Sequence, residues 1–497
     1  MFSHLSNNSP KRFDFLLKPA WIAFIASLVL SFIAVSRMDM PNRDGMLYIE
    51  TASIFLEEGL AAAQANFDWV FLPVCIAFVS KITGLGIETT AYLFCSLFFA
   101  GTCAILVRIT EIQFSEAGWY ACLVVLTLPA FNGQRDELLR ESGYWFFSLL
   151  SILVALYWQR QKDYKKGFAI QICLGLACLF RVEAAIFFIA FALWQVWNAQ
   201  ERKIQLRNLS TLLWLPASVG VILLILVLSG KFDFAERIVN YSYAINPTIA
   251  LSNFNTAAQQ FGDTILNHYS AGDAGYILFL GLLSLAIKKF ILNNGIFIIP
   301  LLFFFLDKSQ KKLISLWKPQ NHFFYLYFII LIIFVTYKLF ISSRYIVFLN
   351  LLTIPLIAQG IKEVIGRFPR WRFFVLLCIV ITLLANMISL SPRSLQFKEA
   401  GKWLSEHPEL MSQTYIEGTR TRYYAGRKFR RNEILDHQEI EKSIAAGEFE
   451  YFSLELKKEK PKKTEWVNSL PLDEIMRFSN EHGDAIVILK RNDSLKN

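Results

Sequence analysis

The chain has 497 residues, of which 55% are hydrophobic and 18% are charged, and its mean hydropathy is +0.40. The apolar residues come in blocks, and several blocks reach the ~18 residues of a membrane-spanning helix, which excludes an ordinary soluble protein. The basic residues behind the net charge of +10 are scattered among loops between these blocks, so membrane topology explains them better than nucleic acid does.

Eleven apolar segments are expected to cross the membrane as helices. In chain order they cover about 19–36, 88–107, 118–133, 144–159, 167–181, 184–199, 210–229, 290–306, 322–341, 345–361 and 372–390. With the N-terminus inside, the loops on that side carry 19 Lys and Arg residues and the opposite loops about half as many. The positive-inside rule therefore predicts a cytoplasmic N-terminus. The stretch 275–305 fits one crossing or two, and we expect one.

Three loops are expected on the outside, at 37–87, 132–143 and 230–274. The first should hold an amphipathic helix around Ile49 and Ile54, followed by an interfacial helix over 68–84. Hydrophobicity falls after about residue 392, so residues 1–391 are expected to form the membrane domain and 392–497 a small periplasmic α/β domain. Within that domain the spacing predicts a helix over 394–407 and a strand over 484–491.

Charged side chains gather at four of the expected outside turns, where a cavity at the bilayer surface is the usual reason for such residues. These groups are Asp39, Arg43, Asp44 and Glu50; Arg135, Asp136, Glu137, Arg140 and Glu141; Arg181 and Glu183; and Arg344 with Tyr345.

Each group also has a simpler interpretation. Asp44 can be a turn residue, Arg181 and Glu183 a structural ion pair, and Arg344 an interfacial anchor. The charges of the second loop have the spacing of helical ion pairs. Their coincidence at four turns favours a shared site.

Such a site suits a substrate that is both lipid and phosphate. A carboxylate can take a proton from an acceptor hydroxyl or amine, or bind a divalent cation through its oxygens. Arginines can hold a phosphate by bidentate contacts and stabilise it as a leaving group. A sugar linked to a lipid phosphate requires both kinds of group together.

The order of several segments resembles the GT-C membrane glycosyltransferases, in particular the broad family of lipid A aminoarabinose transferases and protein O-mannosyltransferases. The matching segments are RDGMLYIETASIFLEEG, DWVFLPVCIAFVSKITG, GYWFFSLLSILVALYW, LGLACLFRVEAAIFF, SSRYIVFLNLLTIPLIAQG, FKEAGKWLSEHPEL and YIEGTRTRYYAGRKF. The resemblance implies an α-helical polytopic membrane protein with about 11 transmembrane helices, interfacial helices and a small C-terminal α/β soluble domain. It implies a multi-pass protein of the bacterial inner membrane.

The same resemblance implies a reaction. A hexosyl or pentosyl group would pass from a polyprenyl-phosphate-linked sugar to a glycan, lipid or protein acceptor at the periplasmic face, with inversion. Asp44 matches the catalytic general base, and Asp136 or Glu141 matches the second-loop acid. The other candidates are Arg344, Tyr345, Arg140 and Arg181 for the donor phosphate, and Arg43, Tyr48 and Glu50 for the acceptor or loop support. The first loop lacks an adjacent acidic pair, so no cofactor is assigned, and a divalent cation (Mg²⁺ or Mn²⁺) stays an option.

Two alternatives remain at this point. A lipid-linked saccharide polymerase or ligase would share the donor and the membrane side, but it usually lacks a C-terminal soluble domain. A transporter of lipid-linked or anionic solutes often has two similar halves and charges deep in its spans, and the sequence shows neither. A glycosyltransferase is therefore the expected function.

Overall fold

The computed structural model describes residues 18–198, 201–229, 247–307, 313–387, 395–427 and 435–492. The chain divides into two compact units. The first comprises Met1–Phe32, Ser96–Arg135 and Arg140–Met387, and the second Ile33–Cys95, Asp136–Leu139 and Ile388–Asn497. The expected domain boundary near residue 391 lies outside the described residues, as does the 230–246 part of the third loop.

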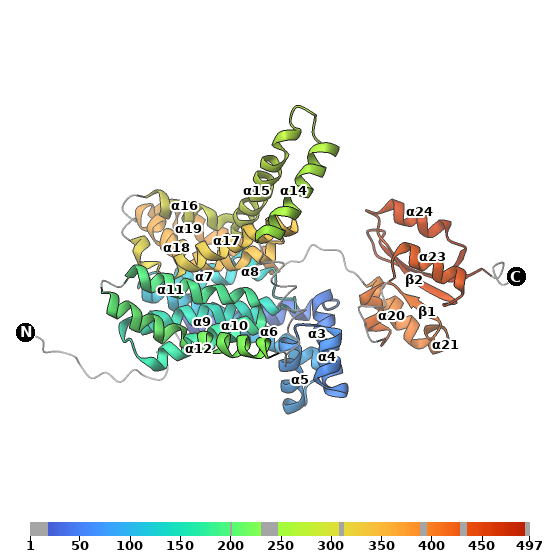
Figure 1. Ribbon diagram of the computed structural model, residues 1–497, viewed down its shortest axis with the longest axis horizontal. Coiled ribbons are helices and arrows are strands. Elements are labelled where there is room, and N and C mark those ends of the chain that lie inside the picture. Colours follow the sequence, from blue (N-terminus) through green and yellow to red (C-terminus); the bar gives the residue numbers. More distant parts are fainter. Residues whose placement is uncertain are drawn as a thin grey trace, which may run out of the picture. The chain divides into compact units, whose positions relative to one another are not determined.

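The described part of the first unit is helical (Figure 1). Its helices are α2 (Pro19–Ser36), most of α6 (Ile87–Gln113), α7 (Gly118–Thr127), α8 (Pro129–Asn132), α9 (Arg140–Arg160), α10 (Tyr164–Phe180), η1 (Val182–Ala185), α11 (Ile186–Asn198), α12 (Arg202–Leu228), α14 (Pro247–Thr264), η2 (Ala271–Asp273), α15 (Ala274–Asn294), η3 (Gly295–Phe297), α16 (Ile298–Leu306), α17 (Gln320–Lys338), α18 (Ser343–Arg367), η5 (Pro369–Trp371) and α19 (Arg372–Met387). Seven helical segments of the described chain are long and apolar enough to cross a membrane. The polytopic helical fold expected from the sequence is confirmed.

The bounds of two expected spans are wrong. Pro129, which lacks an N–H, begins the short helix α8 and divides the segment 118–133. Gly295, at φ +55°, divides the segment 290–306. On either side, α15 has 21 residues and α16 has nine, which correspond to lengths of about 31 Å and about 14 Å. Only α15 is long enough to cross a hydrocarbon core of about 30 Å alone.

Helix α18 is enclosed by the first unit. Every residue from Ile346 to Ile361 is buried, and α18 packs against α7, α15, α16 and α17. A Cβ at Gly360 would lie 2.2 Å from the backbone oxygen of Pro300, so this glycine allows α16 and α18 to approach closely. The N-terminal turn of α18, with Arg344 and Tyr345, is thus held by a packed core.

The second unit combines helices with a small sheet. Its helices are α3 (Arg43–Glu58), α4 (Leu60–Asn66), α5 (Phe71–Thr83), the start of α6, α20 (Gln396–Glu406), α21 (Pro408–Met411), α22 (Thr419–Tyr424), α23 (His437–Ala446) and α24 (Pro461–Ser469). Its strands are β1 (Thr414–Ile416), β2 (Tyr451–Leu456), β3 (Leu472–Ser479) and β4 (Ala485–Arg491). The sheet order is β1-β2-β4-β3, with β1 and β2 parallel and the other pairs antiparallel.

Several elements of this unit agree with the sequence patterns. Helix α3 is amphipathic and buries Ile49 and Ile54, and α20 and β4 lie where a helix and a strand were expected. The unit also joins the first-loop segment to the C-terminal domain. Met40 packs against a cluster that contains Phe397, and the Tyr423 hydroxyl donates a hydrogen bond of 3.0 Å to Glu88 Oε2.

Candidate functional site

An ion cluster in the first unit forms where three helices begin or end. Helix α10 ends at Phe180, Arg181 has extended backbone angles, and the 3₁₀ turn η1 follows at once. This turn lets the Arg181 guanidinium contact Glu183 Oε1 at 2.7 Å and Glu141 Oε1 at 2.6 Å. Glu141 lies in the first turn of α9 and Arg344 in the first turn of α18, and Arg344 Nε is 3.9 Å from Glu141 Oε1.

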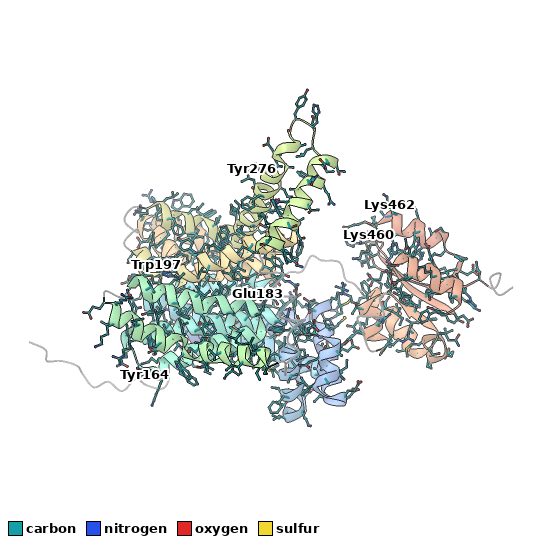
Figure 2. The ribbon with its side chains drawn as sticks, in the orientation of Figure 1. Tyr164, Glu183, Trp197, Tyr276, Lys460 and Lys462 are labelled. Carbon is teal, nitrogen blue, oxygen red and sulfur yellow. The ribbon has the colours of Figure 1, made fainter. Side chains whose placement is uncertain are left out.

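The two arginines differ in burial and in their distance from Glu141. The side chain of Arg181 is 14% exposed and pairs with two carboxylates, whereas that of Arg344 is 31% exposed and lies farther from Glu141. Burial alone would raise the pKa of Glu183, but the charge and hydrogen bonds of Arg181 outweigh burial, so this pKa lies below its usual value. Figure 2 labels Glu183 among the side chains of the helices.

Tyr345 connects the arginines to the packed core. The guanidinium carbons of Arg181 and Arg344 lie 5.0 and 5.5 Å from the centre of its ring, within the range of a cation–π contact. The Tyr327 hydroxyl donates to the Tyr345 backbone oxygen at 2.9 Å. These contacts fix the first turn of α18 relative to Arg181.

Helix α15 adds a third cation that the sequence analysis missed. Lys289 Nζ lies 3.5 Å from Ser343 Oγ, and Asn293 Nδ2 donates to the Ser343 backbone oxygen at 3.1 Å. Ser343 begins α18, where the helix dipole favours anions. Lys289, Arg181 and Arg344 outnumber the carboxylates Glu141 and Glu183 in this cluster, so it can accept an anion.

Arg140 belongs to the same region. It begins α9 and is half-buried, and its charge lowers the pKa of Glu183. The structure therefore brings together five of the residues that the sequence predicted as site candidates, namely Glu141, Arg140, Arg181, Arg344 and Tyr345.

The other candidates lie in the second unit. Asp44 is half-buried in the first turn of α3. Arg43, Tyr48 and Glu50 belong to the same helix. The start of this helix is fixed because Asn42 Oδ1 accepts from the Leu138 N–H at 3.0 Å and Asn42 Nδ2 donates to the Leu138 oxygen at 3.3 Å.

Tyr48 has a structural place, because it is buried with its ring 5.5 Å from that of Phe67. Asp136 is exposed in the segment 136–139, which is not helical. The interpretation of 136/140 and 137/141 as helical ion pairs is therefore wrong.

Arg135 is buried, and its hydrogen-bond partners among the described residues are uncharged. Its guanidinium donates to Asn132 Oδ1, to the Ser27 oxygens and to Ser31 Oγ at 2.9–3.0 Å, and it lies 3.9 Å from Cys103 Sγ. These bonds tie α2 to the end of α8. Among the described residues, no group of three or more His, Cys, Asp and Glu side chains could hold a metal ion.

No protein-family model and no curated protein matches the sequence. The chain is similar to ArnT. Similar solved structures include ArnT from Cupriavidus metallidurans in the apo state (13% identity, TM-score 0.43) and bound to undecaprenyl phosphate (12% identity, TM-score 0.40). Each covers 95% of this chain and 98% of the ArnT chain. ArnT is a GT-C lipid A aminoarabinose transferase, the family that the sequence motifs resemble.

Proposed function

We propose that the protein is a membrane glycosyltransferase that uses a polyprenyl-phosphate-linked sugar. The observation that carries the proposal is the cluster of Arg181, Arg344 and Lys289 at the N-terminus of the enclosed helix α18. A cationic site of this kind, in a bundle of apolar helices, suits an anion that is attached to a lipid. The acceptor is a glycan, a lipid or a protein.

Arg344 is the proposed contact to the donor phosphate. Arg181 is already engaged by Glu141 at 2.6 Å and Glu183 at 2.7 Å, so its role is to order the site. The Arg344 side chain is 31% exposed, against 14% for Arg181, so a phosphate can reach its guanidinium. Lys289 and the first turn of α18 supply further positive charge.

The proposed reaction is a single displacement. The acceptor oxygen or nitrogen attacks the anomeric carbon while the bond from that carbon to the phosphate oxygen breaks. The electron pair leaves with polyprenyl phosphate, whose charge the cationic cluster stabilises. Asp44 takes the acceptor proton as general base, and attack opposite the leaving group inverts the anomeric centre. Glu141 is held by Arg181, so Asp136 is the second-loop carboxylate that can assist.

A transfer assay in proteoliposomes tests these roles. Asp44→Asn should lower kcat by roughly 10²–10⁴-fold and leave donor binding intact, because a general base acts on turnover. Arg344→Ala should weaken donor binding by roughly 10- to 150-fold, which corresponds to the loss of about 1.5–3 kcal/mol from a charged hydrogen bond.

Arg367→Ala is the matched control for Arg344→Ala. Arg367 lies in the last turn of the same helix and pairs with Asp307 at 2.6 Å, so donor binding should not change. Normal turnover of the Asp44 variant would remove Asp44 from the mechanism. An effect of Arg344→Ala on the acceptor alone would contradict the phosphate assignment.

The proposed placement is the bacterial inner membrane, with residues 392–497 and the site on the periplasmic side and the N-terminus in the cytoplasm. Single cysteines at Ser343 and Thr419, in an active variant without other cysteines, should both react with an impermeant thiol reagent from outside. Labelling of either position only from the cytoplasm would contradict this topology.

A further inference from the structure

Two neighbouring lysines of α15 occupy different environments. Lys288 and Lys289 lie in the apolar segment Ala271–Leu306, which is a candidate membrane span. Successive residues of a helix point about 100° apart, so both side chains cannot face the same partner. Lys289 faces Ser343 at the start of α18. Lys288 is exposed, and no carboxylate in the described ranges pairs with it.

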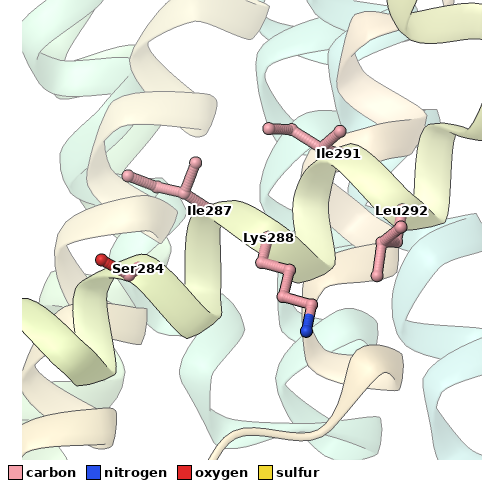
Figure 3. Close-up of a pocket in the computed structure, with 5 residues that line it drawn as sticks. All are labelled: Ser284, Ile287, Lys288, Ile291 and Leu292. Atoms are coloured by element: carbon pink, nitrogen blue, oxygen red, sulfur yellow. The ribbon is translucent and has the colours of Figure 1, made fainter.

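Lys288 lines a groove on the surface of α15. The groove has a volume of about 320 Å³ and is lined by Ser284, Ile287, Lys288, Ile291 and Leu292. In Figure 3 the side chains of Ile287 and Ile291 lie above the ribbon of α15, and those of Lys288 and Leu292 lie below it. The volume is at the lower end of the range for ligand sites. It suits a phosphate and the first groups of a lipid whose tails extend beyond it.

The groove lies on an exposed and largely apolar face of α15. Ile287, Ile291 and Leu292 are all at least 43% exposed, and α15 projects with α14 as a hairpin from the other helices of its unit (Figure 1). An ammonium group on such a face costs free energy unless an anion or water reaches it. The ammonium is the only charged group among the lining residues, so the groove favours an anion.

We propose that this groove binds one anionic phospholipid of the surrounding bilayer. The phosphate would pair with Lys288, the Ser284 hydroxyl one turn earlier can donate to the same phosphate, and an acyl chain would lie along Ile287, Ile291 and Leu292. The neighbouring Lys289 and Asn293 contact Ser343. A lipid bound at Lys288 therefore also steadies the helix that presents Lys289 to the ion cluster.

Native mass spectrometry of the full-length protein can measure this binding. The first phosphatidylglycerol should bind about five-fold more tightly than the first phosphatidylcholine, which corresponds to about 1 kcal/mol for one lysine at a lipid surface. Lys288→Leu should abolish this preference, and Lys288→Arg should retain it. Lys338→Leu is the matched control, because Lys338 is an exposed lysine in the last turn of the apolar helix α17. A preference that survives in Lys288→Leu, or disappears equally in Lys338→Leu, would overturn the proposal.

Photocrosslinking locates the lipid independently of affinity. Phosphatidylglycerol with a diazirine in its acyl chain should label the peptide that contains Ile287 to Leu292 in wild type, and less so in Lys288→Leu. Polyprenyl phosphate serves as competitor. If it displaces the label and its own binding depends on Lys288, the groove belongs to the donor and the phospholipid proposal is wrong.

Arg344→Ala separates this proposal from the proposed function. It should leave phosphatidylglycerol binding unchanged, because the lipid site does not depend on transfer activity. Loss of phosphatidylglycerol binding in Arg344→Ala would place the lipid at the ion cluster and contradict the groove.

Discussion

Replacing Arg181 with Met tests whether the ion cluster orders the site. The guanidinium contacts Glu141 at 2.6 Å and Glu183 at 2.7 Å, and the Glu141 side chain is only 6% exposed. With an effective dielectric constant of about 20, each contact has a Coulomb energy of ~6 kcal/mol before desolvation is subtracted. Removal of one partner from a buried pair typically costs about 3–5 kcal/mol, since it leaves an uncompensated charge. We expect the free energy of unfolding to fall by that amount.

Arg344→Met provides the comparison within the same cluster. Its guanidinium is 3.9 Å from Glu141 and its side chain is 31% exposed, so solvent screens this pair, which contributes at most about 1 kcal/mol. We therefore expect Arg344→Met to destabilise the protein less than Arg181→Met does. Unfolding of the purified protein in detergent, followed by circular dichroism, can rank the two variants. Adding Glu141→Gln to Arg181→Met should recover part of the loss, because a neutral amide replaces the stranded carboxylate.

Two results would contradict an ordering role for Arg181: wild-type unfolding of Arg181→Met, or an equally large destabilisation by Arg344→Met. The first result would mean that the carboxylates find other partners without Arg181. The second would mean that Arg344 is a structural residue of the cluster, which would weaken its assignment to the donor phosphate. A loss of donor binding in an Arg344 variant therefore supports the phosphate assignment only if the variant keeps its stability.

Two further variants probe the cluster and the packing of the helices. Because the pKa of Glu183 is lowered in the folded protein, its stabilising contribution is present above the unfolded value of about 4.3 and is lost as pH falls through the folded value. Glu183→Gln should abolish this part of the acid sensitivity, so the difference in unfolding free energy between wild type and variant should shrink from pH 7 to pH 3. A difference that stays constant over that range would contradict this prediction. Gly360→Ala places a Cβ 2.2 Å from the Pro300 backbone oxygen, so we expect a loss of about 1–3 kcal/mol from overpacking. Gly366→Ala in the same helix meets no atom within 4 Å and should be neutral or slightly stabilising, and equal melting temperatures for the two variants would contradict the close packing.

The sequence predicted which turns carry the charges, but not which of the charges meet. Three separate expected turns contribute Glu141, Arg181 and Arg344. In the folded bundle these helix ends meet, because buried charges need partners. The choice among Asp136, Glu137 and Glu141 was beyond the sequence, since all three occupy one short loop. The structure separates them by environment: Glu141 lies in the first turn of α9, paired with Arg181, whereas Asp136 is exposed in the preceding non-helical segment.

Lys289 shows how an error in helix bounds hides a candidate residue. A span beginning at residue 290 leaves both lysines in the preceding connection, where water solvates them and no partner is needed. In the structure α15 runs from Ala274 to Asn294 and the break follows at Gly295. Both lysines therefore lie on an apolar helix, where each needs a counterpart. The contact with Ser343 accounts for Lys289, and an anionic lipid in the groove accounts for Lys288.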